Sequence, residues 1–365
     1  MRDQRIDFAR GIALIMIVMN HTVPPPIIFE NFGHPQLGHV FAFAGADVFV
    51  YLSGYVCGIA YGKTLIERGF LATQTRALKR CVQIYIAAMI AFVVTWIAMK
   101  LFQQLGPYNV LDQLKFDTDF SFTSIGFLKS LLLIGPYTHF GILLFYIFLL
   151  LLLPTMLWLY ERARPIAIAF SVGLWLLAQY AFFKKQEWIH LFDGAFGNIL
   201  AWQLLFFMGM FIARDRKWLS SATGRFGTLI CILILCLDSY MGQMKWMYFH
   251  FDKKEELGIL RIVELLAAVV LVTRLVPPQA SFFSTGWGAR VRRLGSRSLT
   301  IFAATLPTCY IFTHLAAWVE SKYGHSSHRL DVGRAGYLVL LGAHLLLILG
   351  FDSIMEMVER RKQRK

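Results

Sequence analysis

The stretch RIDFARGIALIMIVMNH, residues 5–21, decides the fold class, because it is a long apolar run that nevertheless holds ionisable side chains. Such side chains are costly inside a membrane helix, so Asp7, Arg10 and His21 are candidates for a functional site. Since helical residues advance by 100° each, the eleven steps from Arg10 to His21 return to within about 20° of the same face and span roughly 16 Å. We therefore expect a membrane helix with Asp7, Arg10 and His21 along one stripe.

The rest of the chain repeats the pattern of long apolar blocks with charges between them. Of its 365 residues, 57% are hydrophobic and 16% are charged, whereas a soluble protein has about 25% charged residues. We predict an all-α, polytopic integral membrane protein with one domain over 1–365 and no soluble domain. Ten apolar segments are candidate transmembrane helices: 8–24, 38–61, 81–103, 138–160, 165–183, 196–213, 225–243, 258–276, 297–319 and 335–356. A short re-entrant or interfacial piece is expected within 122–137.

The net charge of +14 follows the expected topology. With a cytoplasmic N-terminus, the inside segments carry 22 Lys and Arg residues and the outside segments carry 10. This bias fits the positive-inside rule with both termini in the cytoplasm. It explains the basic charge without nucleic acid, for which the chain has no groove-reading motif or basic aromatic platform. The five cysteines lie in or at the ends of apolar segments, which indicates packing rather than disulfides.

The stripe of the first segment suits two kinds of chemistry. Asp7 and Arg10 are three residues apart and can pair on one helix face. The Arg10 guanidinium can bind a phosphate or a carboxylate with its planar fork. His21 titrates near neutrality and is the usual general base of enzymes. The alternative is structural: Arg10 anchors the helix at the lipid headgroups, and His21 ends a helix that breaks before Pro24.

A second motif, GADVFVYLSGYVCGIAYGK at 45–63, combines small residues with one carboxylate. Gly54 and Gly58 form a Gly-x-x-x-Gly pair, which allows two helices to approach closely. Packing explains the glycines but does not explain Asp47, which needs a partner inside the membrane. Plausible partners are Arg10 and His21, the latter with Asp47 as its orienting carboxylate. Three further side chains of the motif offer hydroxyls: Tyr51, Ser53 and Tyr55.

Other polar residues lie at the entrances of apolar segments. Arg76 and Arg80 precede the third segment and are either topology signals or contacts to an anionic cofactor at the inner face. The motifs GNILAWQ at 197–203 and GSRSL at 295–299 each open a segment. Their polar side chains are candidates for lining a cavity: Asn198, Trp202, Gln203 and Ser298. No His-Glu-x-x-His or Cys/His spacing is present, so we predict no metal.

Two outer segments, 104–137 and 243–257, carry aromatic residues together with carboxylates. Such segments can hold a sugar by ring stacking and by hydrogen bonds to its hydroxyls. The alternative is an interfacial aromatic belt, which membrane proteins commonly have.

Four motifs carry a resemblance to a known family. RIDFARGIALIMIVMNH resembles the first span of OpgC-type membrane proteins and of the wider transmembrane acyltransferase superfamily, which includes acyltransferase family 3. Its signature of Arg or Lys, ten residues and then His is matched by Arg10 and His21. DVFVYLSGYVCGIAYG, AWQLLFFMG and LGSRSL resemble further elements of the family. Two positions depart from it: Asn20 stands where relatives commonly have Asp, and Ser296-Arg297 where they have Arg followed usually by His.

The resemblance implies O-acyl transfer across the bacterial inner membrane. A cytoplasmic acyl-CoA, succinyl-CoA for OpgC proteins, donates the acyl group, and a periplasmic glycan such as an osmoregulated periplasmic glucan accepts it. We expect His21 as the base with Asp47 orienting its ring, and Arg10, Arg76 and Arg80 near the phosphates of the coenzyme. Supporting positions are Asp7, Asn20, Tyr51, Ser53, Tyr55, Trp202, Gln203 and Ser298.

Several alternatives stay open from the sequence. The chain can instead be an O-acetyltransferase of lipopolysaccharide or capsule, a glycan transporter without enzymatic activity, or a structural membrane protein. A covalent acyl-histidine intermediate competes with direct transfer. The oligomeric state is not determined, and a homodimer is one option.

Overall fold

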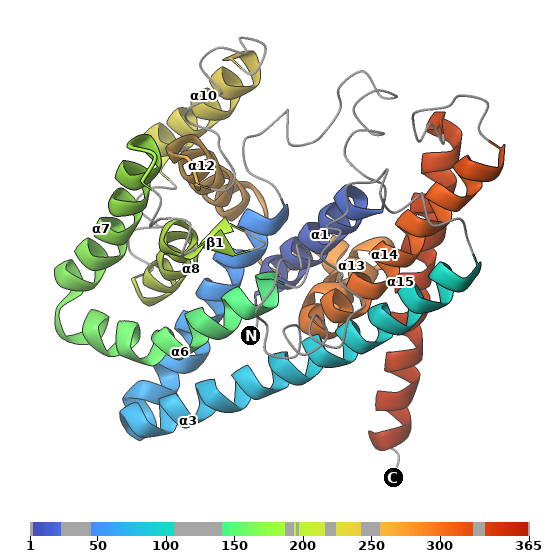
Figure 1. Ribbon diagram of the computed structural model, residues 1–365. Helices are drawn as coiled ribbons and strands as arrows, with labels where there is room; N and C mark the ends of the chain where they lie inside the picture. Colours follow the sequence, from blue (N-terminus) through green and yellow to red (C-terminus); the bar gives the residue numbers. More distant parts are fainter. Residues whose placement is uncertain are drawn as a thin grey trace.

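The computed structural model describes residues 3–22, 45–105, 141–186, 193–194, 197–215, 224–241, 256–323 and 333–363. Within these ranges the chain is helical apart from one short antiparallel strand pair (Figure 1). The elements are α1 (Gln4–His21), α3 (Gly45–Leu105), α6 (Gly141–Arg162), α7 (Arg164–Phe183), β1 (Asp193–Gly194), β2 (Gly197–Asn198), α8 (Ile199–Arg214), α10 (Arg225–Met241), α12 (Ile259–Leu275), η3 (Ser281–Ser284), α13 (Gly286–Ser296), α14 (Ser298–Tyr323) and α15 (Gly333–Gln363).

Where the structure describes them, all ten predicted apolar segments are helical apart from a few end residues, among them Gly197–Asn198, which form β2. The second and third segments are the two arms of α3. The expected piece at 122–137 lies outside the described residues. The short helix α13 was not predicted; it lies in the stretch that precedes the ninth segment. The all-helical fold class is therefore confirmed.

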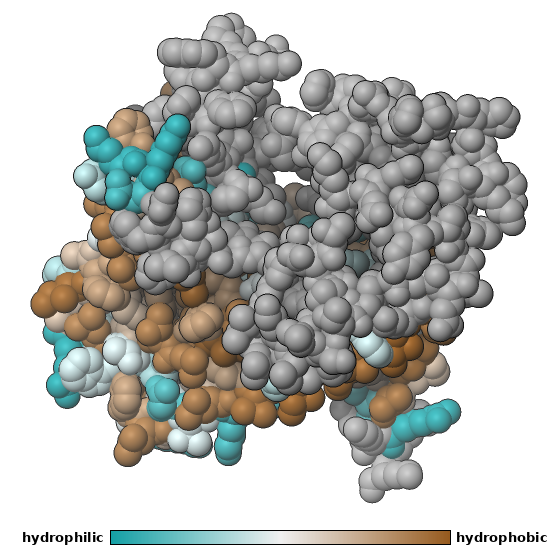
Figure 2. Space-filling view, in the orientation of Figure 1, coloured by the Kyte–Doolittle hydropathy of each residue, from teal (hydrophilic) through white to brown (hydrophobic). Residues whose placement is uncertain are grey.

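Four helical stretches are long and apolar enough to cross a membrane, namely Gly45–Ala98, Gly141–Arg162, Arg164–Phe183 and Leu338–Glu359. Three shorter apolar stretches lie on α8, α10 and α14. The count of ten transmembrane helices thus stays a prediction. Large apolar side chains are exposed along the second arm of α3 and along α7, and they form much of the brown surface in Figure 2. An apolar exterior of this kind suits a lipid environment.

The bend in α3 is made by Gly69. Its backbone has φ 80° and ψ −178°, a conformation that is essentially restricted to glycine. A Cβ atom at this position would meet nothing within 4 Å, so backbone conformation alone requires glycine here. The bend folds the second arm back beside the end of the first arm, at the left of Figure 1.

Close helix packing by small residues confirms the Gly-x-x-x-Gly prediction. A Cβ atom on Gly54 would overlap the Phe206 carbonyl of α8, and one on Gly58 would lie 2.8 Å from the Met210 carbonyl. Gly209 of α8 faces the Tyr51 carbonyl in the same way. The first arm of α3 and α8 therefore run side by side and parallel, in near backbone contact.

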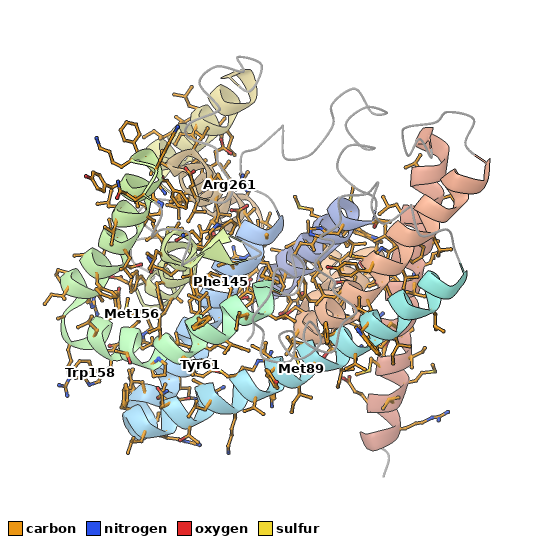
Figure 3. All side chains as sticks on the ribbon, viewed as in Figure 1. Tyr61, Met89, Phe145, Met156, Trp158 and Arg261 are labelled. Atoms are coloured by element: carbon orange, nitrogen blue, oxygen red, sulfur yellow. The ribbon has the colours of Figure 1, made fainter. Side chains whose placement is uncertain are left out.

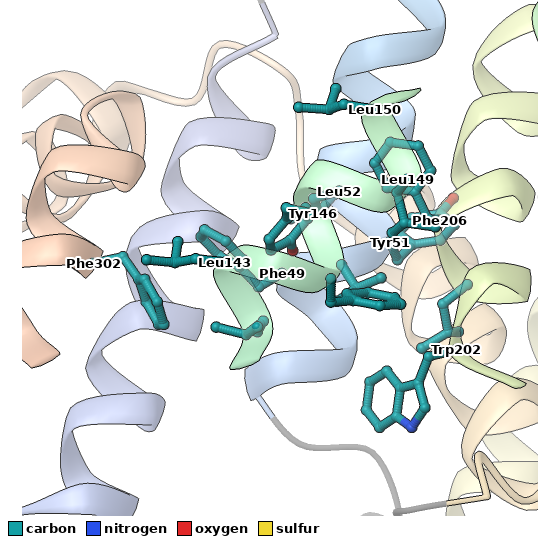
Figure 4. Packing of buried hydrophobic residues seen from close by; sticks show 14 of the residues in the cluster. Phe49, Tyr51, Leu52, Leu143, Tyr146, Leu149, Leu150, Trp202, Phe206 and Phe302 are labelled. Carbon is teal, nitrogen blue, oxygen red and sulfur yellow. The ribbon is translucent and has the colours of Figure 1, made fainter. Parts of the chain in front are cut away.

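Helix α1 lies between this layer and the C-terminal helices (Figure 1). Its Gly11 faces the Val291 carbonyl of α13, and Gly295 of α13 faces the Asp7 carbonyl, so the two helices are antiparallel and closely packed. Aromatic contacts join the neighbouring helices: Phe49 of α3 contacts Tyr146 of α6 and stacks on Phe302 of α14 (Figure 4). The predicted functional stripe is thus placed in the centre of the helical assembly.

Candidate functional site at the two ends of helix α1

The N-terminal end of α1 carries Asp7 and Arg10. The Asp7 side chain is buried where α1 meets α13. The Arg10 guanidinium lies over the Phe49 ring, 5.4 Å from its centroid. Because Phe49 belongs to the first arm of α3, Arg10 faces the motif that also supplies Ser53 and Cys57.

The bend at Gly69 brings Arg76 to the same region. Its Nη1 atom donates hydrogen bonds to the Ala60 carbonyl at 2.8 Å and to the Thr64 hydroxyl at 2.5 Å. The guanidinium also lies 4.9 Å from the Tyr61 ring centroid, and Figure 3 labels this tyrosine near the bend. Arg76 is exposed, so one face of the group stays open to solvent.

Three predicted anion-binding residues converge on one point of α3. Arg10, Arg76 and Arg80 all lie within electrostatic range of the Cys57 thiol. Arg80 is half-buried and donates a hydrogen bond to Gln83 at 3.0 Å. We call Arg10, Arg76 and Arg80 the arginine cluster. Sequence patterns indicated each arginine separately, and the structure groups them; Cys57, assigned to packing, lies among them.

Tyr146 of α6 adds a buried hydroxyl beside this cluster. The hydroxyl lies within electrostatic range of Arg10 and Cys57. Tyr146 was not among the predicted site residues. The available signal was weak, because it is one phenol in an otherwise apolar segment.

At the other end of α1, the His21 ring is held by its own helix. Nδ1 lies 2.8 Å from the Ile17 carbonyl oxygen. A carbonyl only accepts hydrogen bonds, so this contact assigns the proton of the neutral ring to Nδ1 and the lone pair to Nε2. The Ile17 carbonyl thus orients the His21 ring at Nδ1, the role that we had expected of Asp47.

Asp47 has a different partner from those predicted. Its carboxylate accepts hydrogen bonds from Arg261 of α12, at 2.6 Å from Nη2 to Oδ2 and at 3.3 Å from Nε to Oδ1. Both side chains are almost completely buried. The pair fastens the start of α3 to α12, where Figure 3 labels Arg261. No local pattern indicates this contact, because 214 residues separate the two partners.

A buried histidine lies beside the His21 end of α1. His344 of α15 has Nδ1 3.0 Å from the Thr22 hydroxyl and Nε2 2.7 Å from the Thr308 hydroxyl. Its ring stacks on Phe312 with centroids 4.7 Å apart. We call Thr22, Thr308 and His344 the threonine–histidine bridge. His344 was not among the predicted site residues.

The predicted cavity-lining residues are structural where the structure describes them. Gln203 exchanges hydrogen bonds with Ser171 of α7, at 2.7 Å in each direction. Asn198 caps α8 by accepting from the Leu200 N–H. Trp202 is fully buried in the core (Figure 4). Ser298 is buried at the start of α14. These contacts give the polar residues at the entrances of apolar helices a structural role, and their place along a cavity stays a prediction.

Of the remaining predicted residues, Tyr51 lies on α3 and Asn20 lies on α1. Tyr51 is buried against α8, and its ring lies 6.5 Å from that of Tyr55. Asn20 is in the last turn of α1, and its side chain lies outside the described part of the structure, as do most of the outer segments. An apolar cavity of about 110 Å³ is lined by residues of α1, α13, α14 and α15, and none of them is a predicted site residue.

The comparison with protein families agrees with these motifs. The family model described as OpgC protein matches residues 2–345, which is nearly the whole chain. The chain matches no curated protein and no solved structure. The match includes both ends of α1, the bend of α3 and the threonine–histidine bridge. This chain is therefore a membrane protein that belongs to the OpgC protein family.

Proposed function

We propose that this protein is an O-acyltransferase of the bacterial inner membrane. It moves an acyl group, succinyl in our proposal, from cytoplasmic acyl-CoA to a hydroxyl of a periplasmic glucan. The chain crosses the membrane ten times, with both termini in the cytoplasm. Family membership favours acyl transfer to periplasmic glucans. The observation that carries the proposal is that α1 has the arginine cluster near one end and a ring-positioned histidine at the other.

The arginine cluster suits the phosphates of the donor. Three guanidinium groups converge from α1 and from the second arm of α3, and Arg76 is open to solvent. Guanidinium binds phosphate oxygens with paired, charge-assisted hydrogen bonds. In this proposal the coenzyme binds here from the cytoplasm, and its pantetheine arm extends along α1. Ser53 and the Tyr146 hydroxyl offer polar contacts beside that path.

His21 suits the role of general base. Its Nε2 atom removes the proton of the glucan hydroxyl while that oxygen attacks the thioester carbonyl. A carbon–oxygen ester bond forms, and the carbon–sulfur bond breaks. The coenzyme leaves as a thiol after taking the proton from the imidazolium. No covalent intermediate on His21 is needed for this balance.

Asp47 is a positioning residue in this proposal. Its pair with Arg261 holds the start of α3 against α12, and Gly45 at the same end of α3 faces the Ala13 carbonyl of α1. Loss of the pair is therefore expected to affect His21 through the packing of α1. The predicted orienting contact of Asp47 with His21 stays a prediction beside this role.

The test is mass spectrometry of periplasmic glucans from a deletion strain that carries the wild-type protein, the His21→Ala variant or an empty vector. The two proteins must be present at equal membrane abundance. We expect base-labile acyl esters only with the wild-type protein, and their added mass identifies the acyl group. Esters restored in full by His21→Ala would exclude His21 as the base. Glucans that are identical in all strains would exclude the proposed acceptor.

A further inference from the structure

The threonine–histidine bridge connects three helices that are distant in the sequence. Thr22 follows the last residue of α1, Thr308 lies on α14 and His344 lies on α15. Thr22 and His344 are fully buried, so hydrogen bonding of their polar atoms matters for stability. The bridge therefore holds the end of α1 against the two C-terminal helices.

The hydrogen bonds of the bridge can be assigned one proton at a time. The Thr22 hydroxyl lies 2.6 Å from the Val18 carbonyl, which only accepts, so the single hydroxyl proton is used there. His344 Nδ1 must then donate its proton to the Thr22 oxygen. In the neutral ring, Nε2 carries no proton and accepts from the Thr308 hydroxyl. The bonds run in one direction, from Thr308 through His344 and Thr22 to the Val18 carbonyl.

This order makes the ring orientation depend on Thr308. The Thr308 hydroxyl also has the Thr305 carbonyl at 3.0 Å and the Ala304 carbonyl at 3.2 Å, but only its bond to Nε2 satisfies the ring. Stacking on Phe312 fixes the plane of the ring. Both nitrogens and one face of the His344 ring are therefore held in place. Through its bond to the Thr22 hydroxyl, the ring in turn fixes the position of Thr22.

Thr22 is the neighbour of His21. Its backbone N–H bonds to the Val18 carbonyl at 2.9 Å and closes the last turn of α1. The His21 ring is held by the Ile17 carbonyl of the same turn. A shift of Thr22 therefore moves the turn that carries the His21 ring.

We propose that His344 is a positioning residue for acyl transfer, which acts on His21 through Thr22 and is itself oriented by Thr308. This inference rests on the proposed function. Because displacement of a reacting group by about 1 Å can cost roughly 100-fold in rate, weakening the bridge is expected to lower kcat. The KM for the acyl donor is expected to stay unchanged, since the arginine cluster contacts none of the three residues in the described structure.

The experiment uses full-length protein purified from membranes, with transfer from acyl-CoA to isolated glucan as the assay. Thr308→Val removes the hydroxyl at nearly constant volume, and Thr308→Ser keeps it. His344→Gln is the second probe of the bridge. Thr95→Val is the matched control, because Thr95 is fully buried and its hydroxyl donates to the Ala91 carbonyl of its own helix. Thermal unfolding is measured for every variant.

We expect Thr308→Val and His344→Gln to lower kcat by at least about tenfold with the donor KM within about twofold of wild type. Thr308→Ser and Thr95→Val should retain wild-type kcat. Wild-type kcat in Thr308→Val, or an equal loss in Thr95→Val, would overturn the role of His344 while the transferase function stands. A wild-type protein without transfer activity would overturn the proposed function, and this inference with it.

Discussion

The two ends of α1 are built in opposite ways. At the arginine end, Arg76 bonds to residues 12 and 16 positions earlier in the same bent helix, and its side chain is exposed. At the histidine end, Thr22 is held by His344, 322 positions away, and both side chains are buried. Local, solvent-facing contacts suit a site that admits a charged donor. Distant, buried contacts suit a site whose geometry must not change during chemistry.

The largest expected effect is the loss of the base at the histidine end. His21→Ala should lower the transfer rate by about 10²–10⁴-fold, the usual contribution of a general base, without lowering the melting temperature. Met19→Ala is the matched control, since it truncates another half-buried side chain in the same last turn. Initial rates with purified protein check this. A rate loss in Met19→Ala as large as that of His21→Ala would assign the effect to packing.

The next effect concerns the buried ion pair beside α1. Asp47→Leu should destabilise the protein by about 3–5 kcal/mol, because it removes the carboxylate that faces the buried Arg261 guanidinium. Thermal or denaturant unfolding in detergent checks this. The double variant Asp47→Leu with Arg261→Met should regain most of the stability and of the transfer activity. A stable but inactive double variant would show that Asp47 takes part in the chemistry directly.

The bend at Gly69 tests how the arginine end is assembled. Gly69→Ala should cost about 1–3 kcal/mol in stability, because alanine does not favour φ 80° with ψ −178°. The donor KM should rise as well, since the bend places Arg76 and Arg80. Gly173→Ala is the control: its site is equally open and its φ is not positive. Equal melting temperatures for Gly69→Ala and the wild type would contradict the strained bend.

The smallest effect is expected from single charges at the arginine end. Arg76→Gln and Arg80→Gln should each raise the donor KM by roughly tenfold, the size of one charge-assisted hydrogen bond, with little change in kcat. Lys79→Gln removes a charge from an exposed position between them and should leave KM unchanged. Steady-state kinetics with varied acyl-CoA distinguishes the three. A similar rise in KM for Lys79→Gln would show that the arginine cluster acts only through general positive surface charge.

The comparison also explains what the sequence could predict. Hydrophobic blocks located the helices, because lipid-facing and core-facing positions of a membrane helix are both apolar. Helical periodicity placed Arg10 and His21 on one stripe, and Gly-x-x-x-Gly predicted a close helix–helix contact, which α3 makes with α8. These features depend on neighbours within one helix.

Patterns within one helix do not predict which side chains of distant helices come into contact. Asp47 pairs with Arg261, and Thr22 pairs with His344. The chain has many other polar residues, and only tertiary packing determines which of them meet. Gln203 shows the converse: a polar residue in an apolar helix, selected as a candidate for lining a cavity, bonds to Ser171. A buried polar side chain needs a hydrogen-bonding partner, whether or not it has a role in chemistry.

The most direct test of the account is equilibrium binding of acyl-CoA to the purified wild-type, His21→Ala and Arg10→Gln proteins. In the proposed mechanism the donor binds at one end of α1 and the chemistry takes place at the other. We therefore expect His21→Ala to bind the donor with wild-type affinity and Arg10→Gln to bind it at least about tenfold more weakly. Wild-type affinity in Arg10→Gln, or lost binding in His21→Ala, would contradict this division between the two ends of the helix.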